Sequence, residues 1–200
     1  MKKDLTDRRM LRTRALLHEA LISLILKKGY DGITIQDIID KANVGRSTFY
    51  AHYTGKEDLL RSGFTHLREL LLEQQKQALA KRGDPKARSL GFSLAMFEHA
   101  LEHRELYMAL VGQRGGTVVM QQLRKVLAEL VHDDIAATLK ITTPDAKKRE
   151  VIVEFVVGAF ITLLTWWLDH KAKISPAEID SIFRELVLHG ITRSQDLPQK

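Results

Sequence analysis

The spacing of apolar residues constrains the fold of this 200-residue chain more than any other feature. Apolar side chains recur three and four positions apart along almost the whole sequence, which is the period of an amphipathic α-helix. No alternating run joined by a tight turn indicates a β-hairpin. Because 44% of the residues are apolar, the chain can bury a sizeable core. The sequence therefore predicts an all-α fold.

Capping residues and helix breakers divide this pattern into separate helices. An apolar face between Leu16 and Ile25 predicts a first helix, which Lys27, Lys28 and Gly29 end. Five later starts have a capping residue, in two cases with a proline at the first helical position: Thr34 with Asp37, Gly45, Thr54 with Glu57, Asp84 with Pro85, and Ser175 with Pro176 and Glu178. The helix from Thr54 extends toward Lys81, and later helices are expected at 86–102, 104–111, 117–140, 145–171 and 176–189.

Composition excludes several classes of protein. The chain has no cysteine, so disulfides, thiol catalysis and cysteine-ligated zinc are impossible. No apolar stretch of signal-peptide length follows the first charges, and we expect a cytoplasmic protein. The apolar run from Phe155 to Leu168 is shorter than the roughly 20 residues of a membrane span. Since Glu154 and Asp169 flank this run, a helix buried against a partner is the favoured interpretation, and no membrane association is expected.

The positive charge lies mainly in the N-terminal quarter of the chain. Residues 1–56 hold 11 Lys and Arg against 6 Asp and Glu, a net of +5, whereas the remaining residues hold 20 against 19, a net of +1. Such a field attracts a polyanion, although a solvated basic tail gives the same imbalance. Charge alone therefore does not decide between nucleic acid and solvent.

The segment from Thr34 to Tyr53 predicts two helices joined by a tight turn. Asn43 is one of the few residue types other than glycine that adopt the left-handed backbone of such a turn. Phe49 and Tyr53 are four apart and are expected to face inward. The outer faces then carry hydrogen-bonding groups that suit base edges and phosphates, namely Arg46, Ser47, Thr48, Tyr50 and His52.

This segment resembles the DNA-binding domain of the TetR/AcrR family of transcriptional regulators. The residues that match the family pattern are Thr34, Ile38, Ala42, Val44, Thr48, Tyr50, His52, Tyr53, Lys56 and Leu59. The chain departs from it at Ile39, Asn43 and Gly45, where the family has alanine, glycine and serine. The resemblance implies a three-helix helix-turn-helix domain at residues 1–55, joined by a long helix to a helical ligand-binding and dimerisation domain at 56–200.

The resemblance also assigns roles on double-stranded DNA. It places three side chains toward the major groove: Arg46, Ser47 and Thr48. Tyr50 and His52 would lie toward phosphates or flanking bases, and Thr34 and Lys56 would clamp the DNA backbone. Plainer alternatives remain open at this stage, since Tyr50 could be a core residue, Thr34 only a helix cap and Lys56 an ordinary surface lysine.

In this family the last two helices pack against those of a second copy, which implies a homodimer. The expected interface is apolar and consists of Val156, Phe160, Leu163, Leu164, Trp167, Ile179, Ile182, Phe183 and Leu186. The resemblance further implies an unknown small-molecule effector and no cofactor. Candidate contacts for a flat apolar effector are Phe92, Met96, Phe97, Tyr107, Met108, Trp166 and Trp167. Ordinary core packing is the alternative for both sets.

Other classes of site and function receive less support. His99 and His103 are four apart near Glu102, but a solvated polar face explains them better than a metal site, and no metal is expected. Gly112 to Gly116 lacks the strand and the Lys-Ser ending of a phosphate loop, so no enzyme is indicated. A co-activator that has this fold without operator binding is the main alternative. The sequence thus predicts a ligand-responsive repressor that binds a palindromic operator as a homodimer.

Overall fold

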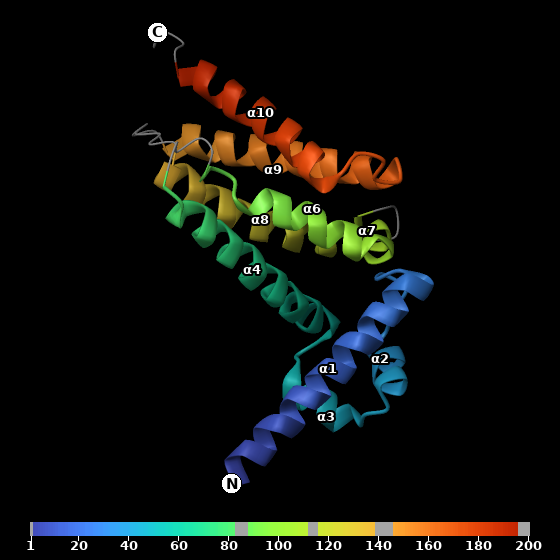
Figure 1. Ribbon diagram of the computed structural model, residues 1–200. Coiled ribbons are helices and arrows are strands. Elements are labelled where there is room, and N and C mark those ends of the chain that lie inside the picture. The colour runs from blue at the N-terminus through green and yellow to red at the C-terminus, as the bar shows by residue number, and fades with distance from the viewer. Residues whose placement is uncertain (1, 83–87, 112–115, 139–145, 196–200) are drawn as a thin grey trace. The chain divides into compact units, whose positions relative to one another are not determined.

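The computed structural model describes residues 2–82, 88–111, 116–138 and 146–195, and these residues form nine helices and no strand (Figure 1). The helices are α1 (Lys2–Lys28), α2 (Ile35–Ala42), α3 (Arg46–His52), α4 (Lys56–Ala80), α6 (Phe92–Glu102), α7 (Arg104–Val111), α8 (Gly116–Thr138), α9 (Ala146–Asp169) and α10 (Pro176–Gln195). The all-α prediction is confirmed.

The chain divides into two compact units. The first comprises residues 1–67 and 105–122, and the second comprises residues 68–104 and 123–200. Helices α4 and α8 contribute residues to both units. The first unit includes α7 and the start of α8 because Leu110 and Val119 are buried in its core. The compact units therefore divide after residues 67, 104 and 122. The boundary between a DNA-binding and a regulatory domain at residues 55 and 56 stays a prediction about function.

Local sequence determines the turns of the first unit. Gly29 has a φ of 72° and donates its N–H to the Ile25 carbonyl, which ends α1 where the sequence predicts it. Asn43 has φ 51° and ψ 50°, the left-handed conformation expected of the turn residue. The Val44 N–H then bonds the Ile39 carbonyl at 3.1 Å, so the turn is compact.

The core of the first unit joins α1, α2 and α3. Leu17, Leu21 and Ile25 of α1 pack in one cluster with Ile38 and Phe49, each 2% exposed or less. Buried apolar area is the main contribution to stability at such a site. This cluster holds α3 through its inward face and leaves the opposite face free.

The capping box predicted at the start of α4 pairs Thr54 with the wrong acid, since its partner is Asp58 and not Glu57. The helix begins at Lys56, and the Asp58 carboxylate accepts hydrogen bonds from the Thr54 N–H at 3.0 Å and the Thr54 hydroxyl at 3.2 Å. Glu57 is one residue too early for this contact. Asp58, four residues after Thr54, therefore accepts the hydrogen bonds of the Thr54 N–H and hydroxyl just before α4 begins.

The predicted helix at 86–102 is interrupted. Leu90 has a φ of 57°, and α6 begins only at Phe92. The cause is not local, because the Asp134 carboxylate of α8 accepts the Leu90 N–H at 2.9 Å. A Cβ atom on Gly91 would collide with the Ala78 side chain, so this close approach requires glycine. The proposed cap at residues 84 and 85 lies outside the described residues.

The remaining helices follow their predicted ranges closely. Lys171 and Ala172 have positive φ values and end α9, and the Ser175 hydroxyl accepts the Glu178 N–H at 3.2 Å at the start of α10. Figure 1 shows α10 alongside α6 and α9 within the second unit. Helix α10 extends to Gln195, beyond the expected end at 189.

Aromatic side chains fill the core of the second unit. The Phe160 ring of α9 lies 4.9 Å from the Phe97 ring and 5.0 Å from the Phe183 ring, measured between centroids. Trp167 packs edge-on to Phe97 and donates its indole N–H to the Ile174 carbonyl at 2.8 Å. These contacts link α6, α9 and α10.

Candidate functional site

Helix α3 presents a polar face. Arg46 and Ser47 are exposed, Thr48 is half-buried, and Tyr50 is 50% exposed. Phe49 is fully buried between them in the core. The open question about Tyr50 is therefore answered, since its ring projects from the surface and packs edge-on to Phe49 at 5.4 Å.

The C-terminal end of α3 is anchored by Tyr53, which is 5% exposed, as the sequence predicts. Its neighbour His52 is half-buried, with its ring centroid 6.3 Å from the Tyr53 ring. His52 thus lies beside the polar face of α3 but is less accessible than Arg46.

Thr34 caps the N-terminus of α2, and its polar groups bond Asp37. Its hydroxyl accepts the Asp37 N–H at 3.2 Å and donates to the Asp37 carboxylate at 2.6 Å, while its own N–H donates to the same carboxylate at 2.7 Å. Lys28 adds an ion pair to Asp37 at 2.8 Å. These donors, Lys28 foremost, hold the pKa of Asp37 well below its usual value. Because the single hydroxyl hydrogen is used, the Thr34 side chain is not free to donate to a phosphate.

Lys56 is also not the free clamp that the resemblance implies. Its ammonium lies 2.9 Å from the carbonyl oxygen of Ile33, 3.2 Å from that of Tyr30 and 3.5 Å from that of Asp31. It also lies 4.6 Å from the centroid of the Tyr30 ring. An ammonium has three donors, and these carbonyls take them. Lys56 therefore stabilises the connection between α1 and α2.

The sequence reasoning missed Gln36 on α2. Its side-chain oxygen accepts a hydrogen bond from the Arg46 guanidinium at 3.2 Å, and its amide nitrogen donates to Asp40 at 2.8 Å. The four-residue spacing of Gln36 and Asp40 on a predicted helix is the signal that could have indicated this contact.

The residues expected to contact an apolar effector are mostly core residues. Phe92, Met96, Phe97 and Trp167 are fully buried in the second unit, and Tyr107 is buried in the first. Trp166 is exposed and its ring stacks on His170 at 4.6 Å, and Met108 is half-buried. None of these residues lines the cleft described next, and their contact with an effector stays a prediction.

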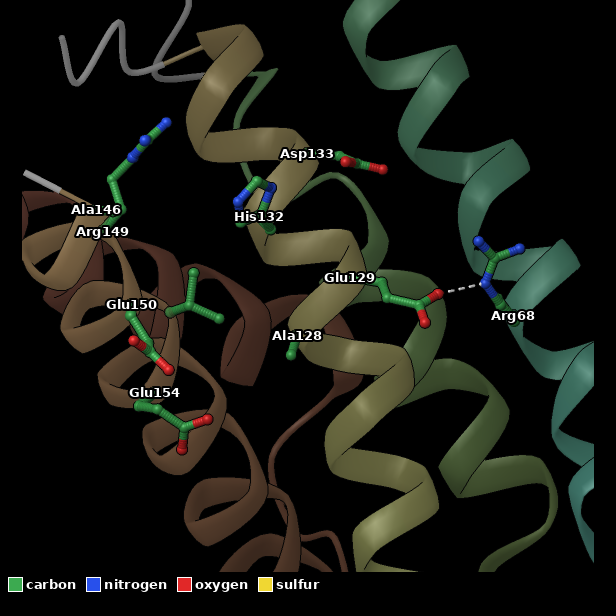
Figure 2. A pocket seen from close by; sticks show the side chains of 10 residues that line it. Arg68, Ala128, Glu129, His132, Asp133, Ala146, Arg149, Glu150 and Glu154 are labelled. Atoms are coloured by element: carbon green, nitrogen blue, oxygen red, sulfur yellow. Dashed lines mark hydrogen bonds and ion pairs between the residues drawn. The ribbon is translucent and has the colours of Figure 1, made fainter. Parts of the chain in front are cut away.

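A charged cleft of about 660 Å³ lies between α4, α8 and α9 in the second unit (Figure 2). Its lining residues are Arg68, Ala128, Glu129, His132, Asp133, Ala146, Arg149, Glu150, Val153 and Glu154. Arg68 pairs with Glu129 at 2.7 Å, which Figure 2 shows as a dashed line, and Glu154 pairs with Arg124 at 3.2 Å. Charged side chains from all three helices therefore line this cleft.

The predicted dimer residues also require a correction. Six of them are at most 2% exposed in the chain's own core and cannot contact a partner in this conformation: Val156, Phe160, Leu164, Trp167, Ile179 and Phe183. Leu163 is half-buried. Ile182 and Leu186 are the exposed members, at 40% and 67%.

Helix α9 is apolar on its outer face as well. Val151, Phe155 and Trp166 are 67%, 57% and 47% exposed on the side opposite the core. Gly158 lies in the same row, and a Cβ there would meet nothing within 4 Å. By length and composition α9 could cross a membrane, yet half of its apolar window is buried, as in a core helix.

The histidine pair gives no metal site in the part of the chain that the structure describes. The His99 and His103 rings lie 4.6 Å apart, but no group of three or more possible His, Cys, Asp or Glu ligands occurs among the described residues.

Two family models match the chain. Residues 17–62 match the model described as bacterial regulatory proteins of the tetR family, and residues 89–189 match a transcriptional regulator C-terminal region. The second match alone spans half of the chain.

Individual proteins agree with these matches. KstR2 of Mycolicibacterium smegmatis, a transcriptional repressor, is 24% identical over 189 residues, which cover 86% of this chain and 87% of KstR2. YxbF of Bacillus subtilis, an uncharacterised regulator, is 47% identical over only 62 residues, 30% of this chain and 16% of YxbF.

Solved structures share the fold. A TetR regulator from Streptococcus agalactiae has a TM-score of 0.64 and 26% identity, covering 92% of this chain and 98% of its own. FadR of Bacillus subtilis, solved with stearoyl-CoA, has a TM-score of 0.62 and 16% identity, covering 86% and 96%.

Proposed function

The chain belongs to the TetR family of transcriptional regulators, and from this premise we propose that it is a ligand-responsive repressor that binds a palindromic operator as a homodimer. It acts by binding, not by catalysis, and works in the cytoplasm. Residues 1–55 form the DNA-binding part, and residues 56–200 sense the effector and dimerise.

The observation that carries this proposal is the two-sided character of α3. Phe49 is locked in the core, while Arg46, Ser47 and Tyr50 project from the other side. A short, rigidly held helix with polar side chains near its N-terminus fits the major groove. Arg46 is the side chain best suited to a guanine edge, and Thr48 and His52 lie beside it.

Selection of DNA fragments by the purified protein tests the operator. We expect a palindrome with half-sites about 34 to 36 Å apart, because two recognition helices of a dimer meet successive major grooves. The Arg46→Ala, Tyr50→Ala double variant should lose specific binding while it stays folded. A wild-type protein that selects no sequence would favour the co-activator alternative.

We place the homodimer interface on the outer faces of α9 and α10. Val151, Phe155 and Trp166 on one helix, with Ile182 and Leu186 on the other, are large apolar side chains exposed to water. An apolar face of this kind usually marks an interaction site. Gly158 has no side chain, so a second helix could approach α9 closely there.

The effector site is proposed at the charged cleft between α4, α8 and α9. FadR of Bacillus subtilis was solved with stearoyl-CoA, which supports effector binding in this fold. The cleft has charged groups from Arg68, Asp133 and Glu150, so we expect a polar effector. Mass spectrometry of small molecules retained by the purified protein, compared with an Asp133→Ala, Glu150→Ala variant, tests the site.

A further inference from the structure

A chain of three exposed side chains connects α2 to α3. The Arg46 guanidinium donates to the Gln36 oxygen at 3.2 Å, and the Gln36 amide donates to the Asp40 carboxylate at 2.8 Å. Arg46 is the first residue of α3, and Gln36 and Asp40 are four apart on α2. The two helices are therefore joined by a hydrogen bond between side chains, at the first residue of the helix proposed to enter the major groove.

In these two hydrogen bonds each polar atom acts either as a donor or as an acceptor. The Gln36 amide group has an oxygen that accepts from Arg46 and a nitrogen that donates to Asp40, so Asp40 fixes which end of the amide faces Arg46. The guanidinium uses one of its five N–H donors on Gln36, and the others are left for a base edge or phosphate.

We propose that Gln36 is a positioning residue that presents the Arg46 guanidinium to a base pair of the operator. An arginine held before binding has less conformational freedom to lose when it reaches DNA. Asp40 supports this role by orienting Gln36. The inference rests on the proposed operator binding and adds a residue of α2 to the determinants of its specificity.

Affinity for the selected operator and for an operator changed at the base pair that Arg46 contacts tests the proposal. That base pair is the one whose replacement no longer affects the Arg46→Ala variant. Gln36→Ala should lower the discrimination between the two operators about fivefold. Its affinity for a scrambled duplex should stay unchanged.

Two further variants separate positioning from a structural role. Gln36→Ala combined with Arg46→Ala should discriminate no worse than Arg46→Ala alone, because Gln36 acts through Arg46. Gln77→Ala is a matched control, since Gln77 donates to Glu73 four residues away on an exposed face of α4. It should leave discrimination unchanged. Gln36→Glu keeps an acceptor for Arg46 but cannot donate to Asp40, so it should retain only part of the discrimination, at a lower overall affinity.

Three results would overturn the inference while operator binding stands: Gln36→Ala discriminating like the wild type, effects of Gln36 and Arg46 that simply add, or Gln36→Ala weakening specific and scrambled DNA equally together with a lower melting temperature. A wild-type protein that discriminates no operator would instead reject the proposed function, and this inference with it.

Discussion

The Oγ atom of Ser62 on α4 lies 2.8 Å from the Nε2 atom of His18 on α1. The Tyr53 hydroxyl lies 3.3 Å from the same nitrogen, so one imidazole of α1 contacts both the residue that ends α3 and helix α4. Burial of the ring, and then the positive charge of Arg14, lower the pKa of His18. The folded first unit therefore favours a neutral imidazole at the point where α3 is anchored.

We expect the protein to lose stability as the pH falls below about 6.5, the pKa of a histidine in an unfolded chain. In that range the unfolded chain takes up a proton at His18 before the folded chain does, and this difference favours unfolding. Thermal unfolding at pH 7 and pH 5 measures the loss. His18→Gln should show a smaller loss, and an equal loss in both proteins would contradict the role of His18.

Lys56→Met should destabilise the protein by about 1 to 3 kcal/mol, because the carbonyls of Tyr30 and Ile33 lose their donor. Denaturant unfolding measures this cost. Since the ammonium binds the protein, Lys56→Met should change the slope of the salt dependence of DNA binding by much less than the unit of about 1 that a lost phosphate contact removes. A full unit of slope lost in Lys56→Met would restore Lys56 as a phosphate ligand.

The turn around Asn43 and the cap at Thr34 could be predicted from the sequence because residues within four positions determine them. The same holds for the burial of Phe49 and Tyr53, whose four-residue spacing follows the helix period. The fold class and the polar face of α3 follow from such local patterns, and both agree with the structure.

The features that could not be predicted from the sequence depend on contacts between residues far apart in the chain. The ligands of Lys56 lie 23 to 26 positions away in sequence, and the break at Leu90 depends on Asp134, 44 positions away. Helix α9 is apolar on both sides, so periodicity alone could not decide whether Phe155 or Phe160 faces the core. Packing of α6 and α10 decides it.

Asp180→Asn should raise stability at pH 7. Burial, only partly offset by Ser93 and Arg184, raises the pKa of Asp180, so the folded state disfavours its charge. The Ser93 hydroxyl contacts Asp180 and donates to the Leu90 carbonyl at 2.7 Å. A neutral side chain at 180 can donate to that hydroxyl, as the asparagine amide would.

The direction of the pKa shift of Asp180 predicts how the effect of this substitution depends on pH. A raised pKa means that its contribution is most favourable below about pH 4 and is lost as the pH rises. The advantage of Asp180→Asn in thermal unfolding should therefore shrink between pH 7 and pH 4. An advantage that is constant with pH would mean that charge burial is not its cause.

Phe155 and Phe160 form a matched pair for testing the dimer, since they lie on the same helix with 57% and 1% of their surface exposed. Phe155→Glu should leave each chain folded but convert the dimer to monomers, because a charge in an apolar interface loses its water. Phe160→Ala should instead cost about 3 to 5 kcal/mol of folding stability through the cavity it leaves.

Sedimentation at several protein concentrations, combined with circular dichroism, distinguishes these two outcomes. A folded Phe155→Glu monomer should also bind a single half-site far more weakly than the dimer binds the whole operator, since the second recognition helix is lost. If Phe155→Glu remains a dimer at concentrations where the wild type does, the outer face of α9 is not the interface, and the partner copy must contact another surface.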